Sequence, residues 1–295
     1  MKALCFGSLN IDYTYKVEHF VSKGETLSST DLKIFSGGKG LNQAIALSKA
    51  GAKTFMAGAI GEDGRFLIDE LSGAGVDTGF VEVKKDIKTG HAIIQNSNDG
   101  DNCILLFGGA NRVITKEQAE KVLSDFEKGD VLVLQNEISE LEHILSTGKE
   151  KGMKTVLNPS PIDEALLKMP IEKADILILN EVEAGRILGK EVSDGIKAAE
   201  ELSEKYPETD IVLTMGEKGS FYKNSKKSFF QPAFKVKAVD TTAAGDTYTG
   251  FFVAGIMEGM QPEKAMEFAS KASAIAVTRP GASPSIPERA EVEIY

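Results

Sequence analysis

The run Asp240–Gly250 (DTTAAGDTYTG) holds the residues of this sequence best suited to chemistry. Its small residues Ala243, Ala244 and Gly245 lead into an apolar helical pattern, so their N–H groups can converge on one point at a helix start. Converging donors can hold a phosphoryl group during transfer, and the neighbouring Asp246 can accept a proton. The alternative is that Asp246 is an N-terminal capping carboxylate, which is common at helix starts.

A second glycine-rich run, Ser36–Gly40 (SGGKG), precedes a helical pattern that begins at Leu41. Glycines let a ligand approach the backbone, and the following helix start favours an anion or a hydroxyl-rich ligand. The run is not a P-loop, because Gly40 rather than Ser or Thr follows Lys39. No GxGxxG fingerprint follows the first predicted strand, which argues against a dinucleotide-dependent oxidoreductase.

Five short apolar runs along the chain are each followed by a polar, turn-forming group. The runs are Ala3–Phe6, Val131–Leu134, Thr155–Leu157, Ile176–Leu179 and Ile211–Leu213. The groups that follow them are, in the same order, Gly7–Asp12, Gln135–Glu137, Asn158–Pro161, Asn180–Glu183 and Thr214–Gly219. Open α/β sheets bind ligands at the carboxyl ends of their strands. We therefore expect these groups to gather at one rim and form a site.

The elements that must position these residues are strands alternating with amphipathic helices. Near-continuous apolar runs suit strands that are buried on both faces of a parallel sheet. Thr115 with Gln118, and Ser139 with Glu142, have the spacing of a capping box and predict two helix starts. The rhythm predicts an α/β fold with helices on both faces of a mostly parallel sheet.

A small β subdomain is predicted where this rhythm is broken. The strand-like segments there are Asp12–Val17, His91–Gln95 and Cys103–Phe107. The connection Asn96–Asp101 (NSNDGD) between the last two is a strong hairpin signal. We expect residues 13–36 and 90–108 to form a flap on a single domain that spans residues 1–295. The alternative is an antiparallel extension of the main sheet.

The composition is that of a globular protein that binds neither nucleic acid nor a membrane surface. Hydrophobic residues make up 42% of the chain, and the formal net charge is −10. An anionic substrate such as ATP would then need local positive groups or backbone donors. Cys5 and Cys103 lie in apolar runs and are expected to be buried thiols in a reducing cytoplasm. The first apolar stretch ends at Gly7, too early for a secretory signal, and no run approaches a membrane span.

The order of these motifs resembles the ribokinase-like, phosphofructokinase-B family of carbohydrate kinases over essentially the whole chain. The resemblance rests on Gly7–Asp12, Gly37–Ala44, Ile60–Gly64, Gly109–Asn111, Leu134–Ile138, Asn180–Glu183, Asp240–Gly250 and Ala276–Ser285. It implies a ribokinase-like three-layer sandwich with a mostly parallel central sheet and a small β-sheet lid. Motifs this numerous are specific to the family and less specific to one sugar.

The resemblance assigns roles at a phosphoryl-transfer site and a sugar site. It implies that Asp246 takes the proton from a sugar primary hydroxyl as this hydroxyl attacks the γ-phosphate of ATP. The N–H groups of Ala243, Ala244 and Gly245 would form the anion hole. The residues expected to hold the sugar are Asn10, Asp12, Gly38, Lys39, Asn42, Glu137 and Asp246. Each buried sugar hydroxyl needs such donors and acceptors.

The resemblance also implies a nucleotide site and two cation sites. The residues expected to bind ATP are Asn180, Thr214, Gly216, Gly219, Gly245 and Ser270. Glu183 would hold Mg²⁺ through water, although Asn180 and Glu183 also have the spacing of an N-cap and its capping-box partner. A K⁺ site built largely from backbone carbonyls would comprise Asp240, Thr242, Ala276, Arg279, Gly281 and Ser285.

The predicted flap is similar to the family's lid, which would exclude water from the site and pair two subunits in a homodimer. His91 stands in this lid where a small apolar residue facing the sugar is expected. The implied reaction is ATP-dependent phosphorylation of a sugar primary hydroxyl, in the first place D-ribose at its 5-hydroxyl. Deoxyribose, another furanose or a nucleoside stays open as the substrate, and so does a non-catalytic sugar-binding regulatory protein.

Overall fold

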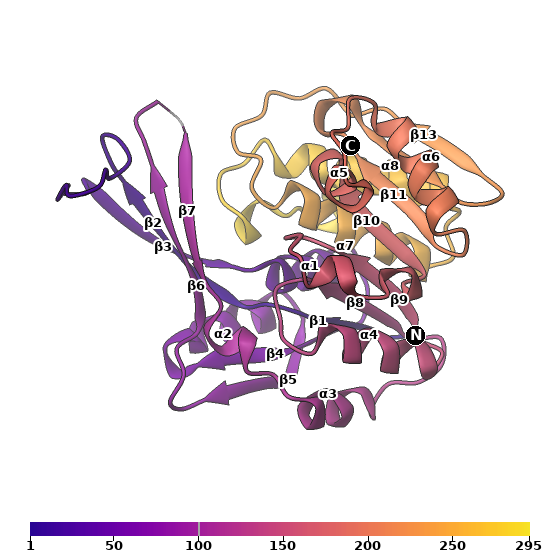
Figure 1. Cartoon of the computed structure of the whole chain (residues 1–295), viewed down its shortest axis with the longest axis horizontal. Helices are drawn as coiled ribbons and strands as arrows, with labels where there is room; N and C mark the ends of the chain where they lie inside the picture. Colours follow the sequence, from indigo (N-terminus) through magenta and orange to yellow (C-terminus); the bar gives the residue numbers. More distant parts are fainter. Residues whose placement is uncertain (100) are drawn as a thin grey trace.

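The structure is a computed structural model that describes residues 1–99 and 101–295. Within these residues the chain forms a large α/β body and a small separate sheet that stands beside it (Figure 1). Gly100, in the predicted hairpin connection, lies outside the described residues.

A mostly parallel sheet of nine strands, counted over the described residues, forms the centre of the body. Across the sheet its strands are β13 (Ser228–Gln231), β12 (Ser220–Lys223), β11 (Asp210–Thr214), β10 (Ile176–Asn180), β9 (Lys154–Asn158), β8 (Val131–Gln135), β1 (Ala3–Phe6), β4 (Thr54–Gly61) and β5 (Asp77–Lys84). β12 runs antiparallel to β11 and β13, which it joins at one edge. The five apolar runs of the sequence are β1, β8, β9, β10 and β11, as predicted.

Helices cover both faces of this sheet, and each face has its own hydrophobic core. One layer consists of α1 (Lys39–Lys49), α2 (Arg65–Gly73), α7 (Ala244–Met257), α8 (Pro262–Ala276) and α9 (Arg289–Glu293). The other consists of α3 (Lys116–Leu123), α4 (Leu141–Glu150), α5 (Glu181–Leu188) and α6 (Gly195–Lys205). In β1, Cys5 joins the first core and Phe6 the second, so alternate side chains serve opposite layers. The predicted three-layer sandwich is confirmed. Among the described residues, no helix is both long and apolar enough to cross a membrane.

The connections place a topological switch point at β1, inside the sheet and two strands from the β5 edge. β1 lies between β4 on one side and β8 on the other, so the chain moves outward from β1 in both directions. Such a point opens a crevice at the carboxyl ends of the strands, where ligands bind. The groups that follow β1 and β8 therefore lie where a site is expected.

Both predicted helices are present, but only one of the two predicted capping residues is confirmed. The Thr115 side chain accepts the N–H of Gln118 at the start of α3, at 3.2 Å. α4 instead begins after Glu140, and the Ser139 hydroxyl donates to the Ile114 carbonyl at 2.8 Å. Because this hydroxyl is hydrogen-bonded to the neighbouring loop, Ser139 does not cap the helix.

The small sheet has the strand order β3 (Asp31–Gly37), β2 (Asn10–Lys16), β6 (Gly90–Asn96) and β7 (Asn102–Phe107). It is separate from the central sheet, so the alternative of an extended main sheet is wrong. The prediction that both thiols are buried holds for Cys5 and is wrong for Cys103. Cys103 is exposed because β7 is an edge strand that lies outside both cores of the body.

Candidate active site

A hollow of about 240 Å³ lies at the carboxyl rim of the central sheet, beside the first turn of α7. It is lined by Lys39, Asn158, Ile178, Leu179, Asn180, Glu183, Thr214, Thr241, Ala243, Ala244, Gly245, Asp246 and Thr249. The ends of β9, β10 and β11 thus meet the Asp240–Gly250 run, so three of the five polar groups contribute to this hollow.

The backbone at the start of α7 leaves room for a ligand. Ala243 has a φ of 58° and a ψ of 10°, a left-handed conformation that is uncommon for alanine and typical of functional turns. The Ala244 N–H donates to the Thr241 carbonyl at 3.2 Å and is therefore partly engaged. At Gly245 an added Cβ would meet no described atom within 4 Å. A helix N-terminus with this open side suits an anion.

The Asp246 carboxylate is buried, with 8% of the residue exposed, and it turns towards α1. Its Oδ2 accepts the Asn42 Nδ2 amide at 3.0 Å, and its Oδ1 accepts the Gln43 Nε2 amide at 2.9 Å. These partners lie on another helix, so the interpretation of Asp246 as the cap of its own helix is wrong. Each carboxylate oxygen keeps a further lone pair, and a proton from a ligand in the hollow can be accepted there.

A second polar cluster lies where the ends of β1 and β8 meet the start of α1, and we call it the Asp12–Glu137 cluster. The Ser8 hydroxyl donates to Glu137 Oε2, which also accepts the N–H of Lys39 at 3.2 Å. Burial, and after it the charge of Glu137, raises the pKa of Asp12 to about 6. Two carboxylates in one half-buried cluster suit a ligand that brings several hydroxyl donors.

Lys39 links this cluster to the hollow beside α7, which it lines. Burial alone would lower the pKa of its amine, but the carboxylates of Asp246, Glu137 and Glu183 together raise it above its usual value. The ammonium is therefore charged at neutral pH. It supplies the local positive charge that an anionic substrate needs in a chain of net charge −10.

Two further predicted sugar ligands differ in how far they are already occupied. The Asn42 Oδ1 is buried and has no hydrogen-bond partner among the described residues, so an acceptor is left for a ligand. The Asn10 Oδ1 already accepts the Asn111 Nδ2 at 2.8 Å. Gly37 permits close packing here, because an added Cβ would lie 2.2 Å from Asp12 Oδ2. Gly38, at a φ of 94°, has a conformation that favours glycine.

The predicted nucleotide residues divide between the hollow and its surroundings. Thr214 and Asn180 line the hollow, whereas Gly216 and Gly219 form the turn after β11, and Ser270 is buried on α8. The N–H of Glu183 donates to Asn180 Oδ1 and the N–H of Asn180 to Glu183 Oε2, both at 2.9 Å. The capping-box alternative is therefore confirmed for this pair. The second carboxylate oxygen of Glu183 is left for another partner at the hollow.

The residues of the predicted K⁺ site come from two segments that the fold brings side by side. Asp240 Oδ1 accepts the N–H of Thr242 at 2.9 Å and its hydroxyl at 2.6 Å, while Oδ2 accepts the N–H of Gly281 at 2.9 Å. The Val239 N–H also donates to the Val277 carbonyl at 2.7 Å. Since the Asp240 oxygens are already engaged, a cation here would depend mainly on backbone carbonyls.

The expectation that the lid position occupied by His91 faces the sugar is corrected by the strand register. In the small sheet His91 pairs with Ile11 and Phe107, whereas Ala92 pairs with Asp12. Successive residues of a strand point to opposite faces, so Ala92, not His91, shares the face of Asp12. The imidazole packs beside the Phe107 ring, with centroids 5.0 Å apart.

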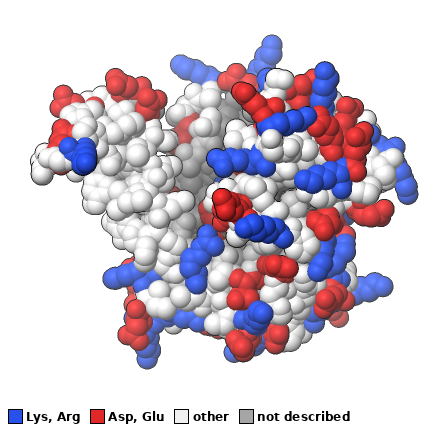
Figure 2. Space-filling view, in the orientation of Figure 1, with Lys and Arg blue, Asp and Glu red and all other residues white. Residues whose placement is uncertain are grey.

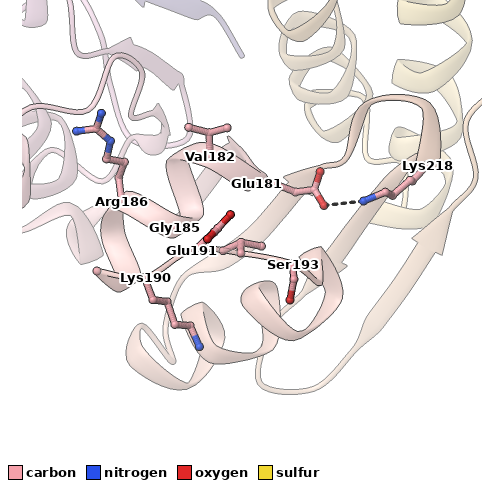
Figure 3. A pocket seen from close by; sticks show the side chains of 10 residues that line it. Glu181, Val182, Gly185, Arg186, Lys190, Glu191, Ser193 and Lys218 are labelled. Carbon is pink, nitrogen blue, oxygen red and sulfur yellow. Dashed lines mark hydrogen bonds and ion pairs between the residues drawn. The ribbon is translucent and has the colours of Figure 1, made fainter.

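A larger hollow of about 670 Å³ lies beside α5, on the surface of the body (Figure 3). Lys218 pairs with Glu181 at 3.2 Å, and Lys190 pairs with Glu201. Figure 3 shows the charged ends of Arg186, Lys190 and Lys218 pointing in different directions. Polar groups must converge to orient a ligand, so we place the candidate site at α7 rather than here.

Comparison with known proteins decides the family. A family model described as "pfkB family carbohydrate kinase" matches residues 1–289. The chain belongs to this family of carbohydrate kinases. The ribokinase of Haemophilus influenzae is 37% identical to this kinase, and the alignment covers 97% of this chain and 95% of the relative. A deoxyribokinase of Salmonella typhi is 32% identical, and the alignment covers 100% of this chain and 98% of the relative.

A solved structure extends the similarity to the three-dimensional fold. It is the Arabidopsis thaliana ribokinase complexed with ribose and ATP. It superposes on this kinase with a TM-score of 0.88 at 28% identity, covering 99% of this chain and 97% of the other. The body and the small sheet together thus match a complete sugar-kinase chain.

Three polar residues at or behind the candidate site received no role from the sequence, namely Ser8, Gln43 and Gln135. All three are fully buried. Each stands next to or near residues that received a role, in the group after β1, in α1 and at the end of β8. The sequence feature that could have identified them is a polar amide or hydroxyl side chain at a position where the apolar pattern predicts burial.

Proposed function

We propose that this protein transfers the γ-phosphoryl group of ATP to the 5-hydroxyl of D-ribose, with Asp246 as the base. The observation that carries the proposal is the buried Asp246 carboxylate, held by two amides beside the open turn at Gly245. The ribokinase relatives, one of them complexed with ribose and ATP, support ribose as the sugar.

In this mechanism Asp246 accepts the hydroxyl proton while the hydroxyl oxygen bonds to the γ-phosphorus and the bond to the bridging oxygen of ADP breaks. Ala243, Ala244, Gly245 and Lys39 line the hollow, and their N–H groups and the Lys39 ammonium would face the charge on the transferring group. The sugar hydroxyls would be held by Asn10, Asp12, Gly38, Lys39, Asn42 and Glu137. Since the transition state is loose, positioning matters more than base strength.

The nucleotide and cation assignments belong to the same proposal. ATP would contact Asn180, Thr214, Gly216, Gly219, Gly245 and Ser270. Glu183 suits Mg²⁺ held through water, because its capping oxygen is engaged and its second oxygen is free for a water ligand. Mg²⁺ offsets phosphate charge when it is bound. K⁺ would be held by Asp240, Thr242, Ala276, Arg279, Gly281 and Ser285, mainly through carbonyls.

We also propose that the small sheet is a lid that pairs two copies of the chain. Its face opposite Asp12 carries side chains that are 45–67% exposed, Leu32, Ile34, Leu105 and Phe107. Figure 2 shows few charged side chains on this sheet below its tip, whereas charges of both signs are interspersed over the body. A contiguous apolar patch of this kind is typical of an interface.

Sedimentation velocity tests this pairing. We expect a dimer that Leu105→Glu converts to monomers, because a carboxylate would be buried in the interface. The matched control is Leu167→Glu, at an exposed leucine of the body. A monomeric parent protein would contradict the proposal.

The use of ATP and the two free cysteines support a cytoplasmic setting, which cell fractionation tests.

The substrate is tested by an ATP-consumption screen over ribose, deoxyribose, fructose, fructose phosphates and nucleosides. We expect the highest kcat/KM with ribose. Deoxyribose is the second candidate, because a deoxyribokinase is 32% identical over the full chain. Turnover of nucleosides alone would overturn the sugar assignment. Sugar binding without any ATP consumption would instead indicate a regulatory protein.

A further inference from the structure

Two buried glutamines form a relay behind the Asp246 carboxylate. Gln43 Nε2 donates to Asp246 Oδ1 at 2.9 Å, and Gln135 Nε2 donates to Gln43 Oε1 at 2.7 Å. Both glutamines are fully buried, and neither lines the hollow. The relay therefore runs from the end of β8 through α1 to the first turn of α7, behind the site rather than in it.

The order of donors and acceptors in this relay fixes which end of the Gln43 amide faces the Asp246 carboxylate. A side-chain amide can be turned over, and only its NH₂ end can donate to a carboxylate. The Gln43 oxygen then needs a donor on its other side, which Gln135 supplies. If Gln43 turned over, its oxygen would face Asp246 and its NH₂ group would face that of Gln135.

Gln135 is itself held in place by close packing. Its Nε2 also donates to Cys5 Sγ at 3.6 Å, and an added Cβ on Gly7 would lie 2.0 Å from its Oε1. The Oε1 is buried without a partner among the described residues. An apolar side chain would avoid this cost, so the contribution of Gln135 lies in the two hydrogen bonds that it donates, to Gln43 and to Cys5.

We propose that Gln43 is a positioning residue that fixes the rotation of the Asp246 carboxylate, and that Gln135 sets the orientation of the Gln43 amide. The inference rests on the proposed role of Asp246 as the base. The second amide on Asp246 comes from Asn42, whose free Oδ1 is expected to hold the sugar. Gln43 is thus the partner that is dedicated to the carboxylate.

The test compares volume-conserving variants. Gln43→Met should lower kcat about 10–100-fold, because a misplaced base loses alignment, while KM for sugar and for ATP changes less than about 2-fold. Gln135→Met should lower kcat about 3–10-fold, since it acts through Gln43. In the double variant kcat should be no lower than in Gln43→Met alone. Gln118→Met is the matched control, because this buried amide donates to the Gly58 carbonyl instead.

Several outcomes would overturn the inference. An unchanged kcat in Gln43→Met, or multiplicative losses in the double variant, would show that the relay does not position the base. Thermal melting checks folding, and if Gln43→Met does not fold, Gln135→Met decides alone. Asp246→Asn separates the two proposals: if it is inactive while both glutamine variants are normal, only the relay fails. If Asp246→Asn keeps its turnover, the base assignment fails first.

Discussion

The two ends of the candidate active site hold their carboxylates in opposite ways. Asp246 accepts hydrogen bonds from two neutral amides of α1, and its surroundings are complete in the protein alone. Asp12 is half-buried near a second carboxylate, Glu137, and its burial, followed by the charge of Glu137, raises its pKa to about 6. The proposed phosphoryl end is thus preorganised, whereas at the proposed sugar end no described residue donates a hydrogen bond to Asp12, and a polyhydroxy ligand can supply the donors. Stability is given up where the ligand binds and retained where the reacting group must be aligned.

The largest effect is expected at the preorganised end. Asp246→Asn should lower kcat about 10³-fold, because the amide cannot accept the hydroxyl proton, while sugar and ATP binding by calorimetry stay nearly unchanged. Asp130→Asn is the control, since this buried carboxylate accepts the N–H groups of Lys2 and Glu127 at the opposite rim of the sheet. It should lose stability and keep its turnover. Near-normal turnover of Asp246→Asn would remove the contrast between the two ends.

A change at the sugar end should act on binding instead. Glu137→Gln should raise the KM for the sugar about 10–100-fold, because a charged hydrogen bond is worth about 1.5–3 kcal/mol, and leave the KM for ATP within about 2-fold. Steady-state kinetics with each substrate varied in turn measures this. Glu142→Gln, at an exposed residue of α4, is the control. A fall in kcat without a change in the sugar KM would place Glu137 with the other end.

The unfavourable burial of the Asp12 charge should lower the free energy of unfolding of the ligand-free protein at neutral pH. The folded-state pKa of Asp12 is about 6, above its usual 3.8, so folding binds a proton between these values and stability is lost as pH rises through 6. Asp12→Asn should therefore stabilise the ligand-free protein by about 2 kcal/mol at pH 7.5. In urea unfolding this gain should shrink as pH falls from 6 towards 4. Equal stability at pH 7.5 would show that Asp12 is not strained.

The smallest effect is expected from the monovalent cation. Asp240 and Thr242 directly precede the anion-hole turn, so K⁺ should act on kcat rather than on the sugar KM. Replacing K⁺ by tetramethylammonium at constant ionic strength should lower kcat a few-fold in steady-state assays. Indifference to the cation would remove the proposed site, and a change confined to the sugar KM would move its influence to the other end.

Much of the fold could be predicted because the signals are local. The five apolar runs became β1, β8, β9, β10 and β11, and the hairpin signal at Asn96–Asp101 lies between β6 and β7. The wrong predictions concern side chains whose surroundings are set by segments distant in the sequence. The Ser139 hydroxyl serves the Ile114 carbonyl instead of its own helix, and Cys103 belongs to an edge strand rather than to a core.

The sequence by itself determined the family, the layered sheet and the small-residue turn before Asp246, because apolar periodicity and turn chemistry act over a few residues. Only the tertiary structure decided which groups hold each carboxylate. Asn42 and Gln43 are 204 and 203 residues away from Asp246 along the chain. Strand register likewise decided that Ala92 rather than His91 shares the face of Asp12. Such partnerships depend on how α1, α7 and the strands pack, and no local pattern encodes that packing.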